Sequence, residues 1–243
     1  MTDFSKSTIL KFFLTEGEKL IIVALLSFES DVSAEFSLVQ SLIGLVCRFI
    51  FQPAEEAAYL VFAADPNPDL NSLRKWLSAM LAIGTCAAMF AVVSGSKFLI
   101  IFYSNKWATE SASQMLVASC TSLIFLALNG ISEAYAFAKG DKEVLKKVRR
   151  LMMVNSVLYI GISYKMAETI GIAGLVYANC INMLIRGASC LYWSMPADKS
   201  TLAFTASLLT HKVFVGLTLL GLSAIVSINH FILPYLLASR NLI

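Results

Sequence analysis

The chain has 243 residues, of which 58% are hydrophobic and 14% charged, with a formal net charge of +3. Soluble domains carry about 25% charged residues on average. With a mean hydropathy of +0.73, this composition excludes a soluble globular protein, a disordered tail and a nucleic-acid-binding module. The five cysteines lie in apolar stretches without CxxC spacing, which predicts buried thiols rather than disulfides or metal ligands.

Seven stretches are long and apolar enough to be membrane-spanning helices, since a crossing needs about 20 apolar residues. In chain order they run near 8–28, 33–63, 73–103, 111–138, 144–166, 171–194 and 204–228. We therefore expect residues 1–243 to form a single all-α transmembrane domain, a polytopic helical bundle with the lipid bilayer as its immediate partner.

The basic residues of the short connections predict the orientation in the bilayer. Eleven lie on one side and four on the other, and the larger group includes the cluster from Lys139 to Arg150. The N-terminus and the 139–150 loop are therefore expected on the cytosolic side. The cluster would also suit anionic lipid headgroups, although the topology alone explains it.

The second span carries ionisable side chains at membrane depth, where each costs roughly 2.5–3.5 kcal/mol at a helix centre. Its polar residues recur every three or four positions and so share one helical face: Ser37, Ser41, Gly44, Arg48, Gln52, Glu55 or Glu56, and Tyr59. Pro53 interrupts the backbone between the arginine and the glutamates, which is tolerable beside a cavity. The alternative is an intrahelical arginine–glutamate pair that only locks the bundle.

Three further spans repeat this pattern. The first carries Glu16, Glu18 and Lys19, the fourth Asn129 and Glu133, and the sixth Asn179, Asn182 and Arg186. At 1.5 Å per residue, the glutamates of the first, second and fourth spans, with Lys19 and Arg186, lie about 9–17 Å from the predicted cytosolic ends. This shared depth predicts a hydrated cavity open toward the cytosol, with Arg48 deeper. The asparagines could instead be hydrogen-bonding partners between helices.

The sequence gives little support to an enzyme. It has only His211 and His230, and it contains no HExxH, GxSxG or aspartate-rich motif. We therefore expect no catalytic residues, no metal site and no cofactor.

Four segments resemble the second half of the eukaryotic Rft family: LTEGEK (14–19), RFIFQPAEE (48–56), NGISEAYAFA (129–138) and ANCINMLIR (178–186). That family belongs to the multidrug, oligosaccharidyl-lipid and polysaccharide exporter superfamily. The resemblance implies an endoplasmic-reticulum membrane protein of N-linked glycosylation that translocates dolichyl-diphosphate-linked oligosaccharide to the lumenal leaflet, as a flippase or an essential accessory factor. It also implies a second lobe, so that a first lobe or a second half-chain is an expected partner.

Under this resemblance, the residues at membrane depth would line the transport cavity. Lys19, Arg48 and Arg186 would contact diphosphate or sugar hydroxyls. Four amides would hydrogen-bond sugars: Gln52, Asn129, Asn179 and Asn182. Five carboxylates would position the cations, bind sugars or carry protons: Glu16, Glu18, Glu55, Glu56 and Glu133. Two other functions stay open, a proton- or cation-coupled exporter of small solutes and a non-transporting scaffold for glycosylation enzymes.

Overall fold

The structure is a computed structural model that describes residues 30–65, 70–195, 201–234 and 236. All regular elements within these ranges are helices. In chain order they are α2 (Ser30–Val46), η1 (Cys47–Phe51), α3 (Gln52–Ala64), α4 (Leu70–Tyr103), η2 (Asn105–Trp107), α5 (Glu110–Lys139), α6 (Lys142–Ile170), α7 (Ala173–Ser194), α8 (Thr201–Leu209), α9 (Lys212–Ser227) and η3 (Ile228–Ile232). The chain is thus an all-α helical bundle, as the composition predicts.

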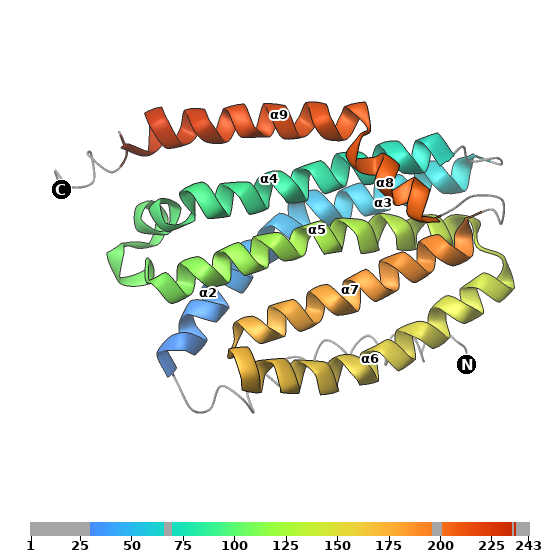
Figure 1. Cartoon of the computed structure of the whole chain (residues 1–243), viewed down its shortest axis with the longest axis horizontal. Helices are drawn as coiled ribbons and strands as arrows, with labels where there is room; N and C mark the ends of the chain where they lie inside the picture. The colour runs from blue at the N-terminus through green and yellow to red at the C-terminus, as the bar shows by residue number, and fades with distance from the viewer. Residues whose placement is uncertain (1–29, 66–69, 196–200, 235, 237–243) are drawn as a thin grey trace.

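Helix α5 is the centre of the bundle, because it packs against α2, α3, α4 and α7. Helix α6 packs on the far side of α7, and α9 packs on the far side of α4. The long helices run side by side along one direction (Figure 1). The start of α5 is fixed by Thr109, whose hydroxyl accepts a hydrogen bond from the Ala112 amide at 3.0 Å and donates one to Glu35 of α2 at 2.7 Å.

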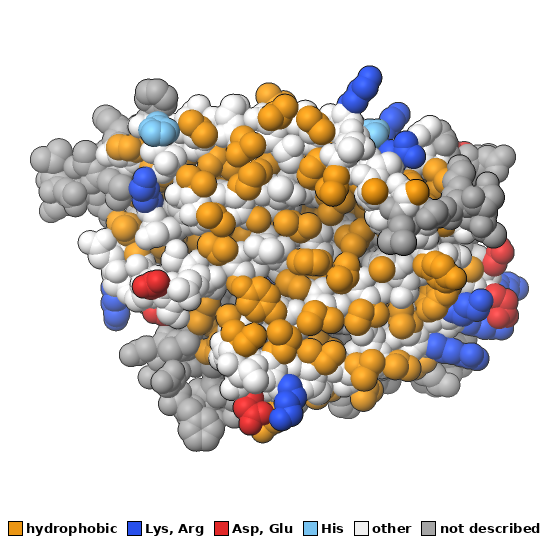
Figure 2. Space-filling model, in the orientation of Figure 1, with side chains coloured by type: hydrophobic (Ala, Val, Ile, Leu, Met, Phe, Trp, Pro, Cys, Tyr) orange, Lys and Arg blue, Asp and Glu red, His pale blue; other side chains and the backbone are white. Residues whose placement is uncertain are grey.

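The core is built mainly from apolar residues of α2, α3, α4 and α5, among them Phe62, Leu77 and Leu123. The rings of Phe62 and Tyr135 meet edge to face with their centroids 5.3 Å apart. Outside this core, large apolar side chains are exposed on α3, α4, α6, α7 and α9. On the face in Figure 2, hydrophobic side chains cover the middle of the bundle, and the Lys, Arg, Asp and Glu side chains lie toward the helix ends. Such a belt is what a bilayer requires of the surface it covers.

Among the described residues, four segments are long and apolar enough to cross a membrane by length and composition, namely 34–64, 70–103, 110–139 and 203–230. They coincide within a few residues with four of the seven predicted spans. The helices predicted at 144–166 and 171–194 are present as α6 and α7 but carry more polar residues. The span predicted at 8–28 lies outside the described residues. The seven-span topology therefore stays a prediction.

One boundary differs from the sequence prediction. The last span, predicted as a continuous helix over 204–228, is broken between α8 and α9. His211 lies at the break, and its ring nitrogen accepts a hydrogen bond from the Val213 amide at 3.4 Å. The side chain thus caps a new helix, which satisfies one of the amides that a helix start leaves unpaired.

Candidate functional site

The polar face of the second span lies on the outside of α2, η1 and α3. We call it the α2–α3 polar stripe; its exposed members are Ser37, Ser41, Arg48, Gln52, Glu56 and Tyr59. The sequence left Glu55 and Glu56 as alternatives, and the structure places Glu56 on the stripe, where its carboxylate accepts a hydrogen bond from the Gln52 amide at 3.4 Å. The stripe is flanked by exposed apolar side chains, including Phe49 at 76% exposure.

Arg48 does not form the intrahelical ion pair that was the alternative interpretation. Within the described residues it pairs with neither Glu55 nor Glu56. Its guanidinium therefore stays exposed near the middle of the segment 34–64, which is otherwise apolar enough to span a membrane. An arginine at such a position is costly when it faces lipid, so this face requires water, a ligand or another protein surface.

Pro53 explains the backbone geometry of η1, the turn that carries Arg48. Proline has no amide hydrogen, so the carbonyl four residues earlier, that of Phe49, loses its helical partner. The helix responds with one π-helical turn, η1, in which the Gln52 amide bonds to the Cys47 carbonyl. Such a turn inserts one residue into the helical repeat and is frequent at functional sites. The same arrangement recurs at η3, which ends two residues before Pro234.

Glu55 leaves the stripe and turns inward against α5. A Cβ atom added to Gly130 would overlap the Glu55 carboxylate, so the glycine provides the space that this side chain fills. The carboxylate also interacts electrostatically with Glu133 of α5 and Arg186 of α7. Three ionisable groups that are distant in the sequence thus gather between α3, α5 and α7.

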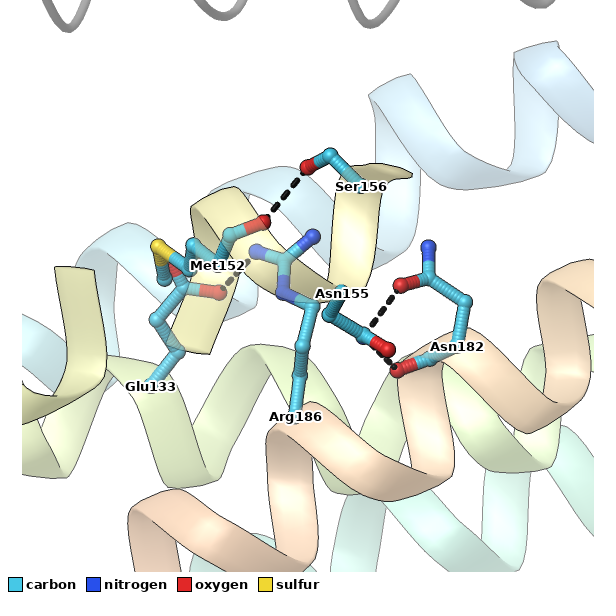
Figure 3. Close-up of polar contacts among 6 residues, drawn as sticks. All are labelled: Glu133, Met152, Asn155, Ser156, Asn182 and Arg186. Carbon is cyan, nitrogen blue, oxygen red and sulfur yellow. Dashed lines mark hydrogen bonds and ion pairs between the residues drawn. The ribbon is translucent and has the colours of Figure 1, made fainter. Parts of the chain in front are cut away.

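The ion pair between Arg186 and Glu133 is the centre of this cluster. The Arg186 Nη2 atom donates to Glu133 Oε2 at 2.7 Å (Figure 3). The two side chains are 23% and 20% exposed. Helices α5 and α7 approach closely here, because a Cβ on Gly187 would lie 3.0 Å from the Asn129 Cα. With two carboxylates and one guanidinium, the cluster has an excess of one negative charge when all three groups are ionised.

Hydrogen-bonding capacity remains on Arg186 of this cluster and on Asn129, which lies one turn before Glu133 on α5. The Asn129 Oδ1 and Arg186 Nε atoms are buried and have no hydrogen-bond partner within the described residues. A buried polar group without a partner is costly. The cluster can therefore take up a further hydrogen-bonding group, such as water or a polar ligand.

The asparagines of α7 differ in their surroundings. Asn182 is buried and accepts hydrogen bonds from the Asn155 amide of α6, at its side-chain oxygen and, at 3.1 Å, at its backbone carbonyl (Figure 3). This contact matches the alternative interpretation, in which asparagines join helices. Asn179 is half-buried one turn earlier.

Sequence reasoning missed Gly130 and could not place three other residues of this region. Gly130 lies beside Asn129 in the sequence, yet only the packing of α3 shows that it accommodates Glu55. Asn155 was expected to serve helix packing rather than the cavity, and its hydrogen bonds to Asn182 agree with that. Glu16, Glu18 and Lys19 lie outside the described residues, so their predicted place in the cavity stays a prediction.

No metal-binding arrangement is found in the part of the chain that the structure describes. No group of three or more His, Cys, Asp and Glu side chains could hold a metal ion there. All five cysteines are free, with Cys120, Cys180 and Cys190 buried. The site is therefore a set of charged and amide side chains suited to hydrogen bonding and charge pairing.

Comparison with known proteins identifies the family of the chain. A family model described as Rft protein matches residues 1–239. The chain belongs to the Rft family. Three curated relatives bear the name Man(5)GlcNAc(2)-PP-dolichol translocation protein RFT1. The Drosophila melanogaster protein is 31% identical over 200 residues, the Xenopus tropicalis protein 28% over 206, and the Eremothecium gossypii protein 29% over 227.

These alignments cover 75%, 79% and 89% of the chain but only 36%, 38% and 41% of the relatives. The chain thus spans well under half the length of these Rft relatives. No solved structure matches it. The α2–α3 polar stripe and the Glu55–Glu133–Arg186 cluster lie within the part that the family model covers.

Proposed function

We propose that the chain acts in the translocation of dolichyl-diphosphate-linked oligosaccharide from the cytosolic to the lumenal leaflet of the endoplasmic-reticulum membrane. Its relatives are named for translocating Man(5)GlcNAc(2)-PP-dolichol. The observation that carries the proposal is the α2–α3 polar stripe, an exposed polar face on a helix that is otherwise apolar enough to span a membrane.

The stripe would form part of the path of the polar headgroup while the dolichyl chain stays in lipid. A guanidinium binds diphosphate oxygens through paired, charge-assisted hydrogen bonds, so Arg48 is the proposed diphosphate contact. Gln52 and Glu56 offer amide and carboxylate groups to sugar hydroxyls one to two turns away. A matching surface would come from the part of the relatives that the chain does not cover.

The Glu55–Glu133–Arg186 cluster would form the inner wall of this path. Arg186 is held by Glu133, and its free Nε and the Asn129 Oδ1 are buried hydrogen-bonding atoms. A sugar or diphosphate group that reached them would supply the missing partners. The excess carboxylate, Glu55, would then disfavour a bare anion and favour a ligand rich in hydroxyl groups.

The test is N-glycosylation in cells that lack their own Rft protein. The gene that encodes this chain is introduced as wild type, Arg48→Ala, Arg48→Ala with Gln52→Ala, or Lys165→Ala. Lys165 is the matched control, because it is an exposed cation whose ion pair within the described residues is with Glu168 at 3.2 Å. We expect a secreted reporter to be underglycosylated with both Arg48 variants and normal with Lys165→Ala, at equal protein levels in the membrane. Normal glycosylation with the double variant would overturn the role of the stripe.

A second measurement separates a translocator from an accessory factor. The purified protein is placed in vesicles that contain a fluorescent dolichyl-diphosphate oligosaccharide, and movement between leaflets is followed by a quencher outside. We expect faster movement with the wild type than with Arg48→Ala. Equal rates for the wild-type protein and empty vesicles would contradict direct translocation.

A further inference from the structure

The first turns of α6 carry a cluster of cations that the proposed function does not use. From Lys142 to Arg150 the sequence KEVLKKVRR has five basic residues and one acidic residue. All five cations are exposed. Lys146 pairs with Glu143 at 3.0 Å, whereas the other four make no ion pair within the described residues. Several blue side chains gather at this end of the bundle in Figure 2.

Four of these cations lie on one face of the helix. At 3.6 residues per turn, Lys142, Lys146, Arg149 and Arg150 fall within an arc of about 100°. We call them the α6 basic face. The opposite side of the helix holds Val148, which is buried against α5 and α7.

The α6 basic face continues directly into the apolar face of the same helix. Met153, Val157 and Ile160 are exposed and follow in the same arc. Arg150 lies three residues before Met153, about 5 Å along the helix axis. The cations therefore stand one turn beyond side chains that suit a hydrocarbon surface, at the level where phospholipid headgroups begin.

We infer that the α6 basic face binds the anionic headgroups of phospholipids in the adjoining leaflet. The rule that basic residues stay on the cytosolic side explains which side the cations occupy, but it does not require them to share the lipid-facing arc of one helix. Clusters of cations next to a membrane helix attract anionic lipids. A lipid fits better than an acidic soluble protein, because the basic and apolar faces are continuous along α6.

A tryptophan at position 153 would report on this surface, because Met153 is exposed and follows the α6 basic face in the same arc. The native Trp193 packs with Val144 and Met152 against the buried Val148, on the opposite side of α6. In the background of Trp76→Phe, Trp107→Phe and Trp193→Phe, the change Met153→Trp therefore supplies the one tryptophan of the chain. Phospholipids brominated near the headgroup end of their acyl chains quench such a fluorophore when they lie beside it.

The experiment uses the full chain in lipid nanodiscs whose two leaflets have the same composition, so that the orientation of the protein does not affect the result. Quenching by brominated phosphatidylserine is compared with quenching by brominated phosphatidylcholine at low salt. We expect the wild type to prefer phosphatidylserine. Replacing all four cations of the α6 basic face by glutamine should reduce the preference at least about fivefold, the value of a single cation near the surface.

Two controls accompany this variant. Exchanging lysine and arginine across the same four positions keeps the charge and should keep the preference. Replacing Lys106 and Lys165, which lie at the opposite end of the bundle, by glutamine should leave the preference for phosphatidylserine unchanged. A wild type without preference, or a glutamine variant with the wild-type preference, would overturn the inference. This outcome is independent of N-glycosylation, so it is distinguishable from failure of the proposed function.

Discussion

The Arg186–Glu133 ion pair predicts that removing either partner alone lowers the stability of the protein by a different amount. Arg186 is the cation of the cluster that faces two carboxylates, because it bonds to Glu133 at 2.7 Å and interacts with Glu55. Arg186→Gln removes the cation of the cluster, so the two carboxylates face each other without a positive charge between them. Glu133→Gln leaves Arg186 with Glu55 as a remaining partner. The first change should therefore destabilise the protein more than the second.

The magnitude follows from the burial of the pair. Breaking a fully buried pair costs about 3–5 kcal/mol, and two unit charges 4 Å apart interact by about 4 kcal/mol at an effective dielectric constant near 20. Since both side chains are about one fifth exposed, we expect a loss at or just below the lower end of this range. Arg186→Gln should lower the free energy of unfolding by about 2–3 kcal/mol and Glu133→Gln by about 1 kcal/mol.

The assay is reversible unfolding in mixed detergent micelles, followed by tryptophan fluorescence. Glu55→Gln alone should change stability by less than about 1 kcal/mol, because it leaves the ion pair intact. Combined with Arg186→Gln, it should restore about 1 kcal/mol by removing the repulsion between carboxylates. Equal losses in the two single variants, with no restoration by Glu55→Gln, would refute the three-membered cluster.

Three other changes test the packing around the site. Gly130→Ala should cost about 1–3 kcal/mol in the same unfolding assay, because the new methyl group overlaps Glu55; the loss should shrink when Glu55→Ala is added, and an unchanged loss would contradict the contact. Pro53→Ala should keep or raise the melting temperature, since it restores an amide donor, while glycosylation activity falls because the π-helical turn is lost; full activity would show that this turn is dispensable. Asn155→Ala should lower the unfolding free energy by about 0.6–1.7 kcal/mol through the lost bonds to Asn182, and no change in stability would contradict a contribution from that contact.

The sequence by itself was enough for the class of protein and for most of the helices within the described ranges. Composition and apolar run length depend only on the residues of each segment, so they predicted the helix over 33–63 that the structure has as α2, η1 and α3. Periodicity likewise predicted the polar face that contains Arg48 and Gln52. The break at His211 was missed, because a continuous apolar run does not show where a side chain caps a new helix.

Only the tertiary structure decided how the polar residues are paired. Glu55 and Glu56 are adjacent in the sequence, and the contact with Gly130 of α5 is what turns one inward and leaves the other exposed. Glu133 and Arg186 are 53 residues apart, and they meet because α5 and α7 approach closely at Gly187. Segment composition and periodicity are local properties, whereas a partner across two helices depends on packing, which no single segment encodes.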